Sequence, residues 1–271
     1  MIEIGEETFR LRGPAEAFPR EIVEDPWVLY HGTSSLHEAR IEAEGLRPGS
    51  STFTKAELSS VLEVFERMNW SGRSHGSRAV LQPYSVNYDF NQERGKPVFL
   101  TEQSGRAARY ASKGCAGGEI AMTLRCCFDE LDEYLHDSGV REGHKADMRL
   151  DWDDAMSTGR LPRPPAPMEA DLDELTASLE GLRSVRERAE AALLEYQYGI
   201  VYAVRIAREA LPGLGGNPSM GVMAFAPLLP DTLIAKVRVP ADYVWHPDDT
   251  DPLVLLARLN TGVLEAIRRA G

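Results

Sequence analysis

Short apolar segments separated by irregular loops constrain the fold of this chain more than any other feature. Alternating or β-branched residues predict strands at 27–31, 98–101, 118–126, 199–206, 221–226 and 233–239. These segments do not alternate regularly with helices, so the order of elements favours an α+β fold over a doubly wound parallel sheet.

Helices are predicted where apolar residues recur at helical spacing. The pattern predicts them at 34–44, 56–69, 104–113, 169–197 and 252–269. Gly45 is a typical C-cap of the first, and Ser104 is a typical N-cap of the third. The polar stretch 70–96 and the Gly/Pro segment 212–218 are predicted to be loops.

Residues 128–197 differ in composition from the rest of the chain. The segment is strongly acidic and contains the low-complexity run LPRPPAPM. We interpret 1–271 as a single domain with 128–197 as an acidic helical insertion, and a separate interaction module is the alternative. One stripe of 169–197 should pack on the domain or contact a protein partner; it comprises Leu172, Leu175, Leu179, Leu182, Val185, Ala189 and Leu193.

Composition narrows the classes of function. Apolar residues make up 43% of the 271 residues, which excludes wholesale disorder. The net charge of −12 disfavours nucleic acid as a partner. No apolar run approaches the roughly 20 residues that span a bilayer, and the N-terminus lacks the pattern of a secretory signal. We therefore expect a cytoplasmic protein without a membrane partner.

No metal site is expected. Cys115, Cys126 and Cys127 lack the spacing of a zinc site or of a disulfide framework. The aspartate groups at 153–154 and 248–251 lack calcium-loop spacing and are interpreted as loop charges.

Two short motifs could carry chemistry. The first is Tyr30-His31-Gly32-Thr33, followed by Ile41 and by GLRP at 45–48. Glycine allows a flat ligand to approach the backbone, whose N–H and C=O could pair with an amide, and the histidine could donate to a ribose hydroxyl. The second is VFLT at 98–101 with Tyr110 on the next helix, and its two rings could clamp a planar heteroaromatic group. Taken singly, each motif is better explained by a structural role.

Together the two motifs resemble the ADP-ribosyltransferase superfamily, in its diphtheria-toxin/poly(ADP-ribose) polymerase-like branch. That branch opens with His-Gly-Ser or His-Gly-Thr, then has an Ile and a Gly-Leu pair, and later a Tyr-Phe-Ala type strand with a second Tyr on the next helix. The resemblance covers roughly 27–48 and 96–113, with a fainter similarity over 199–240. It implies a split β-sheet core and NAD as co-substrate.

The resemblance assigns roles residue by residue. His31 would bind a ribose of NAD, Gly32 the nicotinamide amide, and Tyr110 would stack on nicotinamide. Phe99 stands where the family has another pocket tyrosine, so the ring is kept and the hydroxyl is lost. Thr33, Ser35 and Thr101 are further cofactor-binding candidates.

The chain departs from the family at a late strand, where many members carry a glutamate that stabilises the oxocarbenium-like centre. The counterpart around 219–225 contains no Asp or Glu. Glu102, Glu119, Glu195 and Glu209 could substitute, although each is better explained as a solvated surface charge. Arg73, Arg78 and Arg94 could meet the NAD pyrophosphate or an anionic acceptor, or be ordinary surface charges.

The resemblance therefore implies an NAD-dependent mono-ADP-ribosyltransferase that releases nicotinamide and modifies a protein or small-molecule acceptor. By analogy, such a chain would be a bacterial effector, toxin or defence protein. An NAD hydrolase or an RNA 2′-phosphotransferase on the same fold is the alternative reaction. A catalytically inactive module that binds NAD or ADP-ribose is the alternative outside enzymes.

Overall fold

The computed structural model describes residues 1–48, 53–67, 97–113, 115, 119–158, 171–217, 221–250 and 262–270. The chain divides into two compact units. The first contains 1–50, 91–122 and 192–271, and the second contains 51–90 and 123–191. The described part of the first unit holds all the strands, and the described part of the second is helical, so the chain is a mixed α+β protein.

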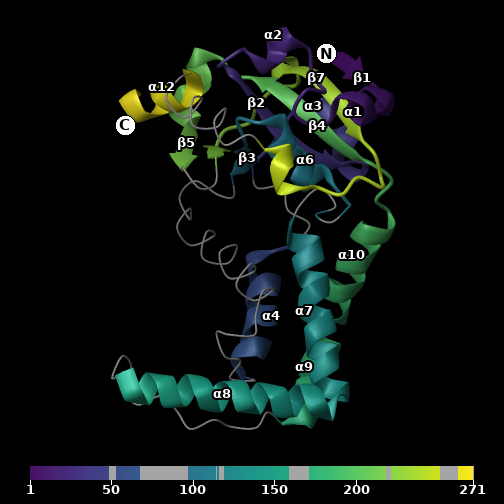
Figure 1. Cartoon of the computed structure of the whole chain (residues 1–271), viewed down its shortest axis with the longest axis vertical. Helices are drawn as coiled ribbons and strands as arrows, with labels where there is room; N and C mark the ends of the chain where they lie inside the picture. Colours follow the sequence, from purple (N-terminus) through teal and green to yellow (C-terminus); the bar gives the residue numbers. More distant parts are fainter. Residues whose placement is uncertain are drawn as a thin grey trace. The chain divides into compact units, whose positions relative to one another are not determined.

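A four-stranded sheet forms the centre of the first unit, in the order β1-β7-β4-β2 (Figure 1). These strands span Ile2–Ile4, Leu233–Val239, Gly199–Arg205 and Val28–Ser34 respectively. The β1–β7 pair is parallel, whereas β7–β4 and β4–β2 are antiparallel. Strand β2 therefore lies at one end of this sheet.

Both faces of the four-stranded sheet are covered, which explains why β4 is a continuous apolar run rather than an alternating one. One face packs against α1 (Glu6–Arg12), α2 (Arg20–Val23) and α6 (Ser104–Ala111) through Phe9, Ile22 and the alanines of α6. The other face contributes Leu29, Ile200, Tyr202 and Val204 to a second cluster. The side chains of successive residues in β2 and β4 thus point into the two hydrophobic clusters on opposite faces of the sheet.

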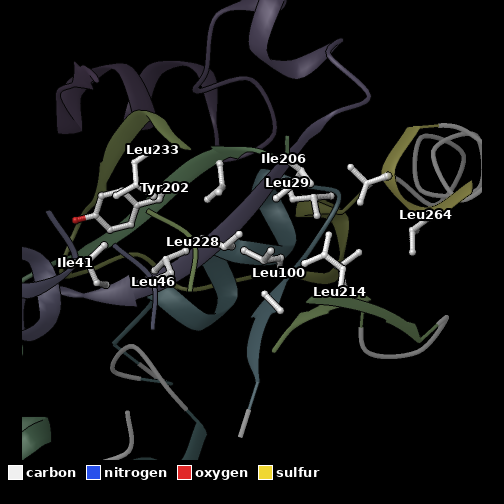
Figure 2. Packing of buried hydrophobic residues seen from close by; sticks show 14 of the residues in the cluster. Leu29, Ile41, Leu46, Leu100, Tyr202, Ile206, Leu214, Leu228, Leu233 and Leu264 are labelled. Atoms are coloured by element: carbon white, nitrogen blue, oxygen red, sulfur yellow. The ribbon is translucent and has the colours of Figure 1, made fainter. Parts of the chain in front are cut away.

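A smaller sheet has the order β3-β6-β5, with strands at Val98–Leu100, Gly221–Ala224 and Leu214–Asn217. Its Leu100 and Leu214 pack with Leu29 and Ile206 of the larger sheet's segments (Figure 2). Helix α3 (Glu38–Glu44) adds Ile41 and helix α12 (Gly262–Ala270) adds Leu264 to the same cluster. The core therefore joins both sheets of the first unit.

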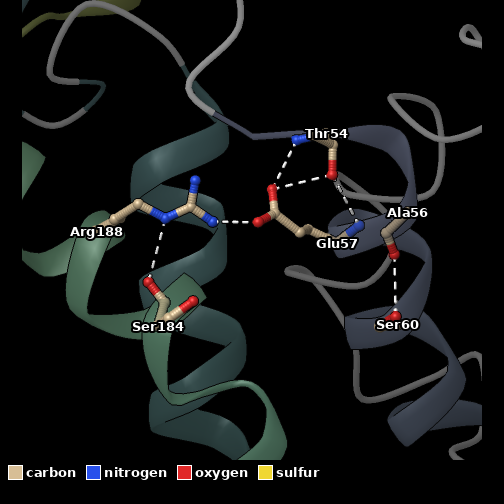
Figure 3. Close-up of polar contacts among 6 residues, drawn as sticks. All are labelled: Thr54, Ala56, Glu57, Ser60, Ser184 and Arg188. Carbon is tan, nitrogen blue, oxygen red and sulfur yellow. Dashed lines mark hydrogen bonds and ion pairs between the residues drawn. The ribbon is translucent and has the colours of Figure 1, made fainter.

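The second unit is built from helices. Its elements are α4 (Lys55–Arg67), most of α7 (Glu119–His136), α8 (Ser138–Thr158), α9 (Leu172–Gly181) and most of α10 (Arg183–Leu194). Arg188 of α10 forms an ion pair with Glu57 of α4, whose carboxylate also accepts hydrogen bonds from Thr54 (Figure 3). Buried apolar side chains of the unit include Leu58, Phe65, Leu124, Phe128, Leu131, Leu175 and Val185.

The prediction of a strand at 118–126 is wrong, because Glu119–His136 is one helix. The short window showed alternation, but the buried residues continue at spacings of three and four as Leu124, Cys127 or Phe128, Leu131 and Tyr134. The single helix predicted at 169–197 is also wrong. It is divided into α9 and α10 beside Gly181, because glycine is a poor helix former.

Smaller corrections concern boundaries. Strand β2 continues to Ser34 rather than ending at His31, so the helix predicted from 34 begins as a 3₁₀ turn at Ser35–His37. Segment 212–218, predicted as a loop, contains strand β5. The N-cap of α6 is Gln103, and the Ser104 hydroxyl donates instead to the carbonyl oxygen of Pro14 at 2.7 Å. Three further 3₁₀ helices lie at Arg208–Gly213, Pro230–Thr232 and Pro247–Asp249.

Candidate functional site

The larger sheet separates from the smaller one directly beside His31. Tyr30 of β2 and Thr101, just after β3, exchange two backbone hydrogen bonds of 2.7 and 2.9 Å. This contact is an isolated bridge, because β3 pairs with β6 rather than continuing along β2. Extending the register would place Phe99 opposite Gly32, and there the described strands form no ladder. The sheets therefore split at His31 and Gly32.

The backbone of Gly32 points toward this split. Ser35 N–H donates to Tyr198 O, and Ile206 N–H donates to Trp27 O, so odd-numbered residues of β2 pair with the β4 side. Tyr30 pairs in the opposite direction with Thr101. Because hydrogen-bonding directions alternate along an antiparallel strand, the N–H and C=O of Gly32 point the same way as those of Tyr30. They form an amide-like donor and acceptor pair at the edge of β2.

The absence of a side chain at Gly32 serves the packing of helix α6. A Cβ atom added at Gly32 would lie 1.9 Å from the carbonyl oxygen of Ala107 and 3.1 Å from the amide nitrogen of Ala111. The same helix crosses Gly199 of β4, where an added Cβ would lie 1.9 Å from Ala111 O. The glycine that we expected to admit a flat ligand therefore admits the backbone of α6.

The imidazole ring of His31 is oriented by a backbone group. Its Nδ1 atom lies 2.9 Å from the carbonyl oxygen of Phe99. A carbonyl oxygen can only accept, so Nδ1 carries the proton and donates. Burial lowers the pKa of His31, with a smaller lowering from His37 and an opposing effect of the Phe99 carbonyl. The ring is therefore neutral near pH 7, and Nε2 is an acceptor rather than the donor expected from the sequence.

Phe99 and Tyr110 lie on the two elements that flank the split. Phe99 is in β3 and is partly buried. Tyr110 is in the last turn of α6, next to Ala111, whose amide nitrogen approaches Gly32. The Tyr110 ring is partly buried and has the guanidinium carbon of Arg109 5.9 Å from its centroid. The fold thus brings His31, Gly32 and Phe99 together, and Tyr110 follows on the helix whose Ala111 backbone crosses Gly32.

Thr33, Ser35 and Thr101, which were predicted to bind the cofactor, are either buried or hydrogen-bonded within the protein. Thr33 and Thr101 are buried, and the Thr101 backbone holds Tyr30. The Ser35 hydroxyl accepts a hydrogen bond from the Gln197 amide at 3.2 Å. Thr101 and Ser35 thus tie β2 and the turn after it to neighbouring segments.

The four carboxylates proposed to replace a late-strand glutamate differ in burial. Glu195 and Glu209 are exposed, and the side chain of Glu119 lies outside the described residues. Glu102 is only 3% exposed and follows Thr101 at the split. Arg73, Arg78 and Arg94 also lie outside the described residues.

No group of three or more potential metal ligands is found in the described ranges. The pairs at 153–154 and 248–249 are not loop charges: the first lies in α8 and the second in a 3₁₀ helix. Within the part of the chain that is described, no helix is both long enough and apolar enough to cross a bilayer.

A polar row that the sequence did not reveal crosses the sheet at His31. In register, His31 lies beside Tyr202, Tyr202 beside Lys236 and Lys236 beside Glu3. The buried Lys236 ammonium contacts Glu38 at 2.7 Å and Glu42 at 2.6 Å on α3. Lys236 and Glu38 are 198 positions apart in the sequence, so only the tertiary structure brings them together. The row fixes α3 against the His31 face of the sheet.

Comparisons of the chain with protein-family models, with curated proteins and with solved structures find no match.

Proposed function

We propose that this chain is an NAD-dependent mono-ADP-ribosyltransferase whose two sheets form the split core of that superfamily. The observation that carries the proposal is that the N–H and C=O of buried Gly32 point toward the split between the sheets, beside an oriented, neutral His31. This pair matches the donor and acceptor of a primary carboxamide such as that of nicotinamide. The order and spacing of the His-Gly-Thr and Phe99–Tyr110 motifs support the same assignment.

In this proposal NAD lies with its carboxamide against the edge of Gly32. The Gly32 N–H donates to the carboxamide oxygen, and the Gly32 C=O accepts from the carboxamide NH₂. The Tyr110 ring stacks on the nicotinamide ring. A ribose hydroxyl donates to Nε2 of His31, since Nδ1 is already committed to Phe99.

The bond between the ribose C1′ and the nicotinamide nitrogen then breaks, and its electron pair neutralises the pyridinium as nicotinamide leaves. The acceptor nucleophile forms a bond to C1′ and loses its proton to solvent. Developing positive charge at C1′ calls for a nearby carboxylate. We assign that role to Glu102, because it is buried and adjoins the Tyr30–Thr101 bridge.

Release of nicotinamide from labelled NAD, with and without cell lysate, tests the proposal. We expect release by the native chain and its loss in His31→Ala. His136→Ala is the matched control, because the His136 Nδ1 also contacts a carbonyl oxygen at 2.9 Å but its ring is exposed on α7. Equal release by the native chain and His31→Ala would overturn the assignment.

The fate of the label separates the alternatives. Label on protein or on a small molecule supports transfer, and free ADP-ribose without labelled product indicates NAD hydrolysis. Binding of NAD without nicotinamide release would identify an inactive binding module. A 2′-phosphorylated RNA that loses its phosphate only with NAD would identify an RNA 2′-phosphotransferase.

A further inference from the structure

One cavity of the first unit lies at the end of the larger sheet where β2 begins and β4 ends. Its volume is about 560 Å³, which is within the roughly 300–1,000 Å³ of typical small-ligand sites. Trp27, which lines the cavity, stands four positions before His31, and this corresponds to roughly 13 Å of extended chain. The cavity is therefore separate from the split between the two sheets.

Two arginines and two aspartates line this cavity, and one pair of them is already matched. The Asp25 carboxylate lies 3.3 Å from the Arg205 guanidinium and accepts a hydrogen bond from the Trp27 amide at 2.9 Å. Arg208 instead has its guanidinium carbon 5.5 Å from the Trp27 ring centroid. Among the described residues, no acceptor pairs with the Arg208 guanidinium and no donor pairs with the Asp231 carboxylate. One cation and one carboxylate of the lining are thus left for a ligand.

The segments that carry these groups are fixed by hydrogen bonds and by packing. The Trp27 carbonyl oxygen accepts a hydrogen bond from the Ile206 N–H at 2.8 Å, which ties the start of β2 to the end of β4. Arg208 begins a 3₁₀ helix whose later residues pack against the core that joins the two sheets. Asp231 lies in another 3₁₀ helix, where the Thr232 hydroxyl donates to a backbone carbonyl oxygen at 2.6 Å. Because the backbone is already ordered, a ligand loses less free energy to ordering it on binding.

The rest of the lining is largely apolar and includes Trp27, Ile206, Ala207 and Ile234. Small-ligand sites typically combine such a lining with a few polar groups that fix the orientation of the ligand. A ligand that matches all of this lining carries a carboxylate for the free cation, an ammonium for the free carboxylate and an apolar side chain. These are the three parts of an apolar α-amino acid.

We propose that this cavity binds a free α-amino acid with an apolar side chain. The Arg208 guanidinium donates charge-assisted hydrogen bonds to the α-carboxylate, because stacking on Trp27 engages only its face and leaves the N–H groups in its plane. The α-ammonium donates to the Asp231 carboxylate, and the side chain of the ligand packs on the apolar lining. The site does not depend on NAD chemistry, since it lies at the other end of β2 from Gly32.

The indole N–H resonances of the full chain provide the test, with L-leucine as the probe. We expect L-leucine to shift the Trp27 resonance, which Trp27→Phe assigns by removing it. Isocaproate lacks the ammonium of leucine and isopentylamine lacks its carboxylate, so each should bind about tenfold more weakly, the loss expected for one charge-assisted contact. A Trp27 resonance that ignores L-leucine, or isocaproate that binds as tightly as L-leucine, overturns the proposal.

Two variants assign the two charges. Arg208→Gln and Asp231→Asn should each weaken L-leucine binding about tenfold. Arg208→Gln should also remove the difference in affinity between L-leucine and isopentylamine, because the carboxylate then has no cation to meet. Asp231→Asn should likewise remove the difference between L-leucine and isocaproate. Differences that persist in both variants would overturn the assignment of these two residues.

Matched controls exist elsewhere in the first unit. Arg238→Gln removes a guanidinium that also stacks on an aromatic ring, with its carbon 4.8 Å from the Tyr198 centroid. Asp248→Asn neutralises an exposed aspartate that follows a proline in a 3₁₀ helix, as Asp231 does. Both controls should bind L-leucine like the native chain, and an equal loss in them would overturn the proposal. Binding of L-leucine to a chain that releases no nicotinamide would support this site and contradict only the enzyme function.

Discussion

The Nδ1 atom of His31 lies 2.9 Å from the carbonyl oxygen of Phe99, so a single ring connects the two sheets where they separate. The contact fixes the tautomer of the ring and thereby the chemistry of Nε2. It also replaces the backbone ladder that β2 and β3 lack at this point. His31 therefore has a structural role as well as its proposed role in binding ribose.

Stability should depend on pH through His31. Burial lowers the pKa of His31 in the folded chain, so below about pH 6.5 the unfolded chain binds a proton that the folded chain excludes. The contribution of His31 to the free energy of unfolding should fall as pH drops below that value, by at most about 1.4 kcal/mol per pH unit. Urea unfolding from pH 7.5 to 5 measures this slope. His31→Gln should show a smaller slope than the native chain, since the other two histidines with a lowered pKa, partly buried His37 and buried His144, are present in both proteins. An unchanged slope would contradict the expectation.

Gly32→Ala should destabilise the first unit strongly. The added methyl would lie 1.9 Å from Ala107 O, so α6 must move away from β2. Overpacking of this kind costs about 1–3 kcal/mol, and displacement of backbone should reach the upper end. Thermal unfolding of Gly5→Ala is the comparison, since nothing lies within 4 Å of a Cβ added there. Equal melting temperatures for the two variants would show that α6 does not cross Gly32 so closely.

Lys236→Met should leave two carboxylates facing an apolar group. Lys236 has only 7% of its side chain exposed and contacts both Glu38 and Glu42, so the variant should lose roughly 3 kcal/mol of unfolding free energy. The double variant Lys236→Met/Glu38→Gln should recover part of the lost unfolding free energy, because one of the two carboxylates is then neutral. Burial opposes ionisation of Glu38, but hydrogen bonds from Lys236 and Tyr198 hold the pKa of Glu38 below its usual value.

The Lys236 contact also predicts a pH dependence. The Glu38 carboxyl has a lower pKa in the folded chain than its value of about 4.3 in the unfolded chain. It therefore stabilises the fold at pH values above about 4.3, and this stabilisation is lost as pH falls through the pKa of the folded chain. Between pH 6 and pH 3, chemical unfolding should show that the free energy of unfolding falls more steeply with pH for the native chain than for Lys236→Met. Parallel curves would mean that the Glu38–Lys236 pair contributes no differential protonation.

Tyr110 should act through its ring rather than its hydroxyl. If the ring stacks on nicotinamide, Tyr110→Phe should bind NAD within about twofold of the native chain. Tyr110→Ala should bind at least about fivefold more weakly, since stacking is worth on the order of 1 kcal/mol beyond area burial. Calorimetric titration with NAD checks this. Loss of binding in Tyr110→Phe as large as in Tyr110→Ala would instead implicate the hydroxyl.

The local sequence was sufficient to predict most strands and the two motifs. Strands β2, β4 and β7 each contain several apolar or β-branched residues, and such residues favour extended structure without reference to the rest of the chain. The same local logic failed at Glu119–His136, because nine residues were too few to separate an alternating period from a helical one.

Only the tertiary structure decided which way the site residues face. The direction of the Gly32 backbone toward the split depends on the pairing of β2 with both β4 and Thr101, and the tautomer of His31 depends on a carbonyl 68 residues away. Trp27 and Arg208 are far apart in the sequence and meet because β2 pairs with β4. Contacts of this kind arise from packing between distant segments, whereas propensity and periodicity describe only neighbours along the chain.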